Sequence, residues 1–174
     1  MPLEASKYSA VEVLRNGREV EIRALRRDDR EALLAATTRA STQSMFRRFF
    51  AAKRAFSEQE ISYFVNIDFI AHVALVAVTQ ENGQAAIIGG ARYIVTQPGT
   101  AEVAFAVVDA YQGQGLGAAL MRHLAAIAQA AGLRELTADV LPDNVPMLKV
   151  FEKSGLALTV QRQTGVVHVV LQLR

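Results

Sequence analysis

Apolar and polar positions follow two different periods along the chain, and the strand-like alternation comes first. Apolar and charged residues alternate over residues 20–24, which predicts a first strand. Three apolar runs, at residues 73–78, 85–95 and 101–108, are joined by the short turn sequences Glu-Asn-Gly and Gln-Pro-Gly. Such short turns between consecutive strands predict an antiparallel meander.

In the segments on both sides of this meander, apolar residues recur at helical spacing. Asp28 or Asp29 can begin a helix, and Gly132 and Gly155 can end one. The predicted helices cover residues 28–36, 41–50, 57–65, 116–131 and 144–154, and further strands are predicted at 136–140 and 166–173. This order predicts an α/β (α+β) fold. It is a single domain with a mixed central sheet, an antiparallel meander and flanking helices, and not a doubly wound sheet.

Composition narrows the function classes. With 174 residues, 51% hydrophobic and 21% charged, the chain has the size of one globular domain, and its net charge of +2 does not indicate nucleic-acid binding. The absence of cysteine excludes disulfides and a cysteine nucleophile, and the three histidines lack the spacing of metal ligands. No apolar run reaches the ~20 residues of a membrane span, and the N-terminus has no signal-peptide core. A cytoplasmic enzyme is therefore the expectation.

The stretch YQGQGLGAAL (residues 111–120) places three glycines directly before a predicted helix. In one frame, Gly113-x-Gly115-x-x-Ala118, it satisfies the dinucleotide fingerprint, with Asp139 at about the expected distance. The meander before it, and the short tail after Asp139, count against the doubly wound sheet that this fingerprint normally opens. No lysine follows the glycines, which excludes a P-loop.

A second frame, Gln112-x-x-Gly115-x-Gly117, predicts a different phosphate site. Several consecutive amides, from about Gly113 to Ala118, lie at the N-terminus of the helix. Unpaired N–H groups and the helix dipole can together hold a diphosphate without a lysine. Glycine is needed because a side chain would stand between the backbone and the phosphate.

This second frame, following AFAVVDAY, resembles the acetyl-CoA pyrophosphate loop of the GCN5-related N-acetyltransferases, the GNAT family. Asn144 and the run FEKSGL (151–156) are similar to the family's second signature, at matching spacing. The resemblance covers residues 19–174 as an N-acetyltransferase domain and leaves residues 1–18 as an N-terminal extension. The stretch SMFRRFF, followed later by AHVALVAV, further resembles bacterial protein-lysine acetyltransferases that modify acyl-CoA synthetases.

The resemblance implies acetyl-CoA as co-substrate. Backbone groups of Ala106, Val107 and Val108 would pair with the pantetheine arm, and the loop amides would hold the pyrophosphate. Asn144 would contact the cofactor, cap a helix, or do both. The implied cofactor-binding residues are Ala106, Val107, Val108, Gln112, Gly113, Gln114, Gly115, Leu116, Gly117, Ala118, Asn144 and Phe151.

Glu102 is the predicted catalytic residue. It is the lone charge in the strand 101–108, and we expect it to be partly desolvated and to act as the general base for an amine. Many family members have a tyrosine that protonates the leaving sulfur, but this chain has Phe151 at that place, which we expect to pack beside the thioester. Tyr111 is only a weak substitute for this acid.

The predicted reaction is acetyl transfer to a primary amine by direct attack in a ternary complex. A protein lysine is the leading acceptor, for example on an acyl-CoA synthetase. A small-molecule amine acetyltransferase and a non-catalytic acyl-CoA-binding regulatory domain are the alternatives. Exposed edge strands could pair two subunits into a homodimer, whereas nucleic acids and membranes are not expected partners.

Overall fold

The structure is a computed structural model that describes residues 4–39 and 58–173. Its described strands form one eight-stranded sheet in the order β1-β2-β3-β4-β5-β6-β8-β7. The strands are β1 (Ser9–Val13), β2 (Glu19–Ala24), β3 (His72–Glu81), β4 (Gln84–Gln97), β5 (Thr100–Val107), β6 (Glu135–Val140), β7 (Ala157–Gln163) and β8 (Val166–Gln172). The described α-helices are α1 (Arg30–Thr38), α3 (Glu58–Val65), α4 (Leu116–Ala130) and α5 (Val145–Glu152), and the 3-10 helices are η1 (Ala5–Lys7), η2 (Arg27–Asp29) and η3 (Asp109–Tyr111).

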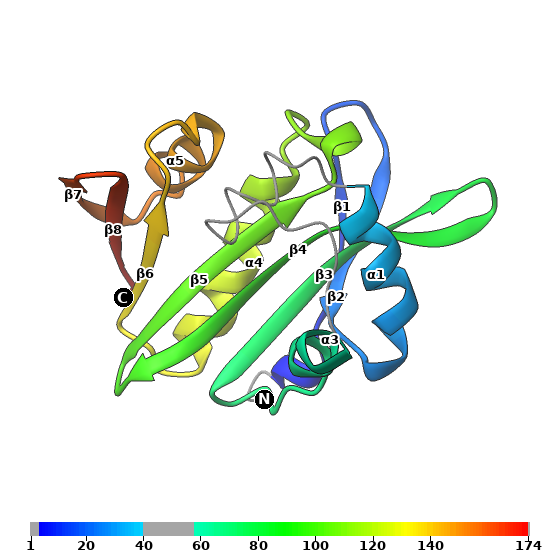
Figure 1. Cartoon of the computed structure of the whole chain (residues 1–174), viewed down its shortest axis with the longest axis horizontal. Helices are drawn as coiled ribbons and strands as arrows, with labels where there is room; N and C mark the ends of the chain where they lie inside the picture. The colour runs from blue at the N-terminus through cyan, green and yellow to red at the C-terminus, as the bar shows by residue number, and fades with distance from the viewer. Residues whose placement is uncertain (1–3, 40–57, 174) are drawn as a thin grey trace.

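Helices cover both faces of the sheet, with α4 on one side and α1 and α3 on the other (Figure 1). Strand β3 shows why two layers form, because its alternate residues are apolar on both faces. Val73 and Leu75 belong to the cluster that contains α4, whereas Ala74 and Val76 pack in a second cluster with Val65 of α3. A strand buried on both faces reads as a continuous apolar run, as VALVAV does.

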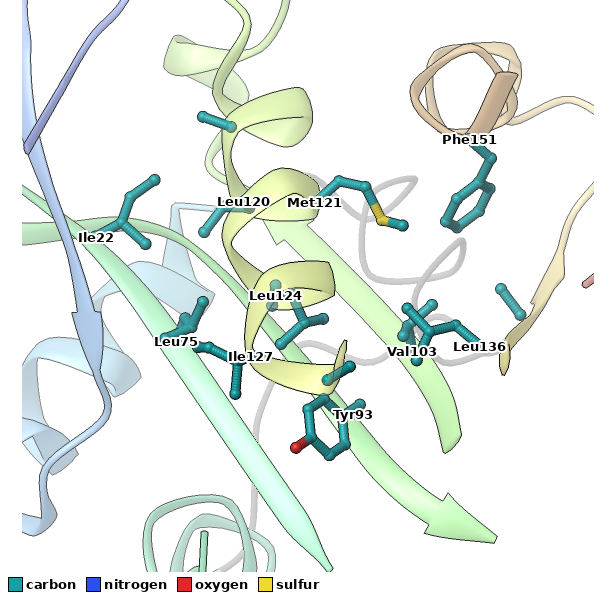
Figure 2. Packing of buried hydrophobic residues seen from close by; sticks show 14 of the residues in the cluster. Ile22, Leu75, Tyr93, Val103, Leu120, Met121, Leu124, Ile127, Leu136 and Phe151 are labelled. Atoms are coloured by element: carbon teal, nitrogen blue, oxygen red, sulfur yellow. The ribbon is translucent and has the colours of Figure 1, made fainter. Parts of the chain in front are cut away.

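Helix α4 packs its apolar stripe against the sheet. Leu116, Leu120, Leu124 and Ile127 recur at helical spacing, and each is at most 1% exposed. Figure 2 shows Leu124 and Ile127 of this helix near Leu75 of β3, whereas Met121 points toward Phe151. Because this stripe fixes α4 on the sheet, it also fixes the position of the loop that enters the helix.

The predicted fold class and the predicted order of elements are confirmed for the described part of the chain. The meander, α4, β6, α5 and β8 lie where the sequence pattern placed them. Strands β1 and β7 were not predicted. The predicted helix at 41–50, the first residue of the helix predicted at 57–65 and the stretch SMFRRFF lie outside the described residues.

The sheet topology also decides between the two frames of the glycine stretch. Within the described sheet, β5 and β6 form the one parallel pair, and all other neighbouring strands are antiparallel. A doubly wound dinucleotide-binding domain needs a mostly parallel sheet, so this chain does not have that fold. None of the described helices is both long and apolar enough to cross a membrane.

Candidate active site

Strands β5 and β6 lie side by side only at their beginning. The paired residues are Thr100 with Glu135, Ala101 with Leu136 and Glu102 with Thr137. Beyond these pairs β5 continues along β4 as far as Val107, and β6 continues along β8 as far as Val140. The two strands therefore diverge toward α5, as Figure 1 shows. From Val103 onward, the β6-facing edge of β5 has no partner strand in the described sheet, which leaves backbone groups for a ligand.

Of the three residues predicted to pair with the pantetheine arm, Ala106 and Val107 lie in this diverging part of β5. Val108 follows the strand, and its N–H donates to the carbonyl oxygen of Ile88 at 2.9 Å. Its own carbonyl oxygen accepts the N–H of Tyr111, also at 2.9 Å. Both backbone groups of Val108 are therefore engaged within the protein, and pairing of Ala106 or Val107 with the cofactor stays a prediction.

The glycine loop (residues 112–117) runs from the end of η3 into the first turn of α4. Gly113 has a φ of +78° and Gly115 a φ of +91°, and this left-handed region is open to glycine at little cost. A Cβ on Gly113 would meet no atom within 4 Å, so open space lies beside the loop. The backbone conformation of the loop therefore explains two of its three glycines.

The first turn of α4 has backbone N–H groups without intrahelical partners, called open amides below. Gly115 is the N-cap residue, and no side chain caps the helix. The N–H of Ala119 reaches back to the carbonyl oxygen of Gly115 at 3.1 Å, so the amides of residues 116–118 precede the first bond of the helix. Such amides, with the positive end of the helix dipole behind them, form an anion site.

The two glutamines of the loop play different parts. Nε2 of Gln112 donates to the carbonyl oxygen of Val107 at 3.1 Å, which ties the loop to the end of β5. Oε1 of Gln114 is buried and, among the described residues, is the one buried side-chain N or O atom without a hydrogen-bond partner. Buried acceptors are normally paired, so an unpaired one inside the glycine loop fits a ligand that brings a donor.

Gly117 lies where α4 faces α5. A Cβ built on Gly117 would lie 3.4 Å from Cγ2 of Val150, at ordinary van der Waals contact. Packing against α5 therefore does not by itself require glycine at this position.

Glu102 stands at the point where β5 and β6 separate, since its pair with Thr137 is the last one between the strands. Its side chain is exposed, so the partial desolvation expected from the sequence is not found in this structure. Five residues of strand span about 17 Å, which is the distance along β5 from Glu102 to Val107. Glu102 and the glycine loop therefore occupy opposite ends of the unpaired edge of β5.

Asn144 and Phe151 have clear structural roles in α5. Oδ1 of Asn144 accepts the N–H of Met147 at 3.3 Å, so Asn144 is the N-cap of the helix. Phe151 is 1% exposed and points from α5 into the core (Figure 2). The centre of its ring lies 5.9 Å from that of Phe105, in an edge-to-face contact. Contact of either residue with the cofactor stays a prediction.

Arg15 contacts the glycine loop and was not predicted as a site residue. It lies on the turn between β1 and β2, and its backbone N–H donates to the carbonyl oxygen of Gln114 at 3.1 Å. Its Nη1 donates to the carbonyl oxygen of Gly113 at 3.3 Å. The sequence signals a turn at Asn16-Gly17, but nothing local indicates that the turn meets a loop about a hundred residues later.

Comparison with known proteins identifies this arrangement. The model of the acetyltransferase (GNAT) family matches residues 30–156, from the start of α1 to the end of α5 and beyond. The chain belongs to the GNAT family. It is an acetyltransferase, and acetyl-CoA is its co-substrate.

Individual relatives agree with this assignment. An acetyltransferase of Pseudomonas aeruginosa is 36% identical over 127 residues, which are 72% of this chain and 68% of that protein. Acetyltransferase Pat of Mycolicibacterium smegmatis is 31% identical over 156 residues, which are 88% of this chain but 46% of that protein. The chain therefore spans about half the length of Pat.

Solved GNAT structures match the fold closely. The GNAT domain of S. lividans PAT has a TM-score of 0.85 and 36% identity, and the match covers 95% of this chain and 97% of that one. Salmonella typhimurium yncA, solved with its cofactor acetyl-CoA, shares the fold at a TM-score of 0.70 and 19% identity, over 89% of this chain and 93% of that one.

The described residues of this GNAT domain fit a CoA ester. The open amides of α4 suit a diphosphate, the unpaired edge of β5 suits the amide groups of a pantetheine arm, and Oε1 of Gln114 offers an unused acceptor. No group of three or more metal-ligating side chains occurs among the residues that the structure describes. Nδ1 of His168 lies 2.7 Å from Asp139, and Nε2 of His123 lies 2.8 Å from Glu12, as structural histidines do.

Proposed function

We propose that this GNAT domain transfers the acetyl group of acetyl-CoA to Nζ of a protein lysine, by direct attack in a ternary complex. The observation that carries the proposal is the position of Glu102 at the last residue pair between β5 and β6. A carboxylate there stands where the unpaired edge of β5 begins, at the far end of the strand from the glycine loop. The chain has no cysteine that could carry the acetyl group in between.

Glu102 acts as the general base in this proposal. A lysine ammonium has a pKa of about 10.4, so at pH 7 almost none of it is the free amine that can attack a carbonyl carbon. The exposed carboxylate of Glu102 can take this proton directly or through one bridging water. A backbone amide on the unpaired edge of β5, near Val107, would stabilise the negative charge that develops on the carbonyl oxygen.

Neither residue considered as the acid for the leaving sulfur can donate a proton to it. Phe151 has no exchangeable proton, and the hydroxyl of Tyr111 donates to a carboxylate oxygen of Glu81. A thiol has a pKa of about 8.5, so departure as a thiolate at pH 7 costs only about 2 kcal/mol. The proposed reaction therefore does not depend on a proton from either of these two residues.

A protein acceptor is supported by the similarity to acetyltransferase Pat and to the GNAT domain of S. lividans PAT. The sequence resembles the bacterial protein-lysine acetyltransferases that modify acyl-CoA synthetases, so a lysine of such a synthetase is the acceptor class that we propose. A small-molecule primary amine is the alternative acceptor.

An acceptor panel tests this proposal. Thiol release from acetyl-CoA is measured with acyl-CoA synthetases, lysine peptides and small primary amines, and mass spectrometry locates the added acetyl group. We expect turnover with a synthetase or a lysine peptide, modification at Nζ, and intersecting double-reciprocal lines. The same peptide with arginine in place of lysine is the matched control and should give only background release. Turnover confined to small amines, or parallel double-reciprocal lines, would contradict the proposal.

A further inference from the structure

We propose that Arg15 is a positioning residue that orients the amides of the glycine loop toward the diphosphate of CoA. The inference deepens the cofactor assignment and rests on it. Arg15 lies outside the segment matched by the family model, on the turn between the two N-terminal strands β1 and β2.

Arg15 binds two consecutive carbonyl groups of the loop. Its backbone N–H donates to the carbonyl oxygen of Gln114 at 3.1 Å, and its Nη1 donates to that of Gly113 at 3.3 Å. The guanidinium also lies against Gly115, because a Cβ on that glycine would be 3.6 Å from Nε of Arg15. One residue therefore contacts the loop at three successive positions.

These contacts determine where the loop amides point. In a trans peptide unit, the carbonyl of one residue and the N–H of the next residue point in opposite directions, and the described chain has no cis peptide bond. With the carbonyls of Gly113 and Gln114 turned toward Arg15, the N–H groups of Gln114 and Gly115 point away from the β1–β2 turn. They precede the open amides of residues 116–118 and lengthen the set of donors available to an anion.

Hydrogen bonds hold the turn that carries Arg15 in place. The N–H of Leu14 donates to the carbonyl oxygen of Arg18 at 2.8 Å, and the N–H of Gly17 donates to that of Leu14 at 2.9 Å. Nη1 of Arg18 in turn donates to the carbonyl oxygen of Gln80 at the end of β3, at 3.0 Å. Because the turn is held on the sheet, the backbone of Arg15 gives the loop a fixed support.

Calorimetric titration of CoA and of 3′-dephospho-CoA into Arg15→Ala tests the proposal. Arg15→Ala keeps the backbone bond to Gln114 and loses only the guanidinium bond to Gly113, which predicts a Kd about fivefold higher for both ligands, because both carry the same diphosphate. The KM for acetyl-CoA should rise by a similar factor, while kcat at saturating acetyl-CoA stays unchanged. Arg15→Lys, which keeps the charge and one donor, should recover part of the affinity. Arg162→Ala, an exposed arginine on the outer strand β7, removes the same charge and should bind within twofold of the wild type.

Two results would overturn the inference. One is CoA binding by Arg15→Ala within twofold of the wild type. The other is a loss with CoA that is absent with 3′-dephospho-CoA, which would mean that Arg15 contacts the 3′-phosphate and does not position the loop. If Arg15→Ala does not fold, Arg15→Gln is titrated in the same way and read by the same two criteria. Failure of the wild type to bind CoA would contradict the cofactor assignment instead.

Discussion

The hydroxyl of Tyr111 donates a hydrogen bond to Glu81, at the end of the β3–β4 hairpin. Arg39 holds the same carboxylate with two further bonds of 2.9 and 3.0 Å. Burial raises the pKa of the Tyr111 hydroxyl, and the hydrogen bond to Glu81 raises it further. Tyr111 therefore has a structural role beside the glycine loop and does not face the gap between β5 and β6.

Replacing Tyr111 with phenylalanine should leave catalysis nearly unchanged. We expect a kcat within about twofold of the wild type, since the hydroxyl donates no proton to the leaving sulfur. The lost hydrogen bond should lower the free energy of unfolding by about 1 kcal/mol. Thiol release and urea denaturation measure the two effects. A drop in kcat of a hundredfold, with loss of the alkaline limb of the pH–rate profile, would assign the acid role to Tyr111 after all.

A substitution at Gly115 should separate backbone strain from cofactor binding. Gly115→Ala places a Cβ on a residue with a φ of +91°, which costs about 1–2 kcal/mol of stability and disturbs the N-cap of α4. Gly83→Ala, in the β3–β4 turn at a φ of +78°, is the matched control. Both variants should lose similar stability in urea, but only Gly115→Ala should also lose affinity for CoA. Equal CoA affinity in the two variants would mean that the loop backbone does not bind the diphosphate.

Asn144 offers a test of its two predicted roles. Asn144→Ala removes the cap of α5 and should cost about 1 kcal/mol of stability, whereas Asn144→Ser keeps a capping oxygen and should cost little. CoA titration of the serine variant then isolates the cofactor role. Weaker CoA binding at unchanged stability would support a direct contact, and unchanged binding would leave Asn144 as a cap only.

Acid sensitivity should arise at the buried pair Arg23–Asp29, which joins β2 to the start of α1. Two 2.8 Å bonds connect the groups, and their side chains are 10% and 8% exposed. Burial alone would raise the pKa of Asp29, but the bonds from Arg23 and from the Arg26 amide outweigh it and hold the pKa below its ordinary value. The pair therefore contributes stability at pH values above about 3.9, and this contribution is lost as the pH falls through the lower folded pKa.

Urea denaturation at pH 7 and below pH 4 checks this pair. Asp29→Asn leaves Arg23 buried without its anion and should lose about 3–5 kcal/mol at pH 7. The variant should also lose less stability than the wild type on acidification. Asp28→Asn, at the exposed neighbouring carboxylate, should stay within about 0.5 kcal/mol of the wild type. An equal acid loss in wild type and Asp29→Asn would place the acid-sensitive group elsewhere.

The interior of the fold was predictable from the sequence, and its edges were not. Buried strands such as β3 carry apolar side chains in a pattern that burial requires. Edge strands need not carry such a pattern, because fewer of their side chains are buried. Val11 and Val13 of β1 are 63% and 65% exposed, and β7 is exposed along nearly its whole length. In β1 the alternation Val11-Glu12-Val13 places both valines on the exposed side, so the pattern does not mark a buried face.

The candidate site was predictable where it depends on local backbone, as at Gly113 and Gly115, whose left-handed conformations require glycine. It was not predictable where it depends on distant pairing. Nothing local tells where β5 and β6 stop pairing, so the position of Glu102 at their point of separation, and its exposure, emerge only in three dimensions. The contact of Arg15 with Gly113 has the same origin, since the two residues are far apart in the chain.

The most direct test of Glu102 as general base is the turnover of Glu102→Gln at saturating acetyl-CoA and lysine peptide. We predict a kcat lower by about a hundredfold or more, an unchanged Kd for CoA, and a residual rate that rises with pH as free amine becomes available. Glu19→Gln removes an equivalent exposed charge at the start of β2 and should retain wild-type turnover. A kcat within twofold of the wild type for Glu102→Gln would contradict the account.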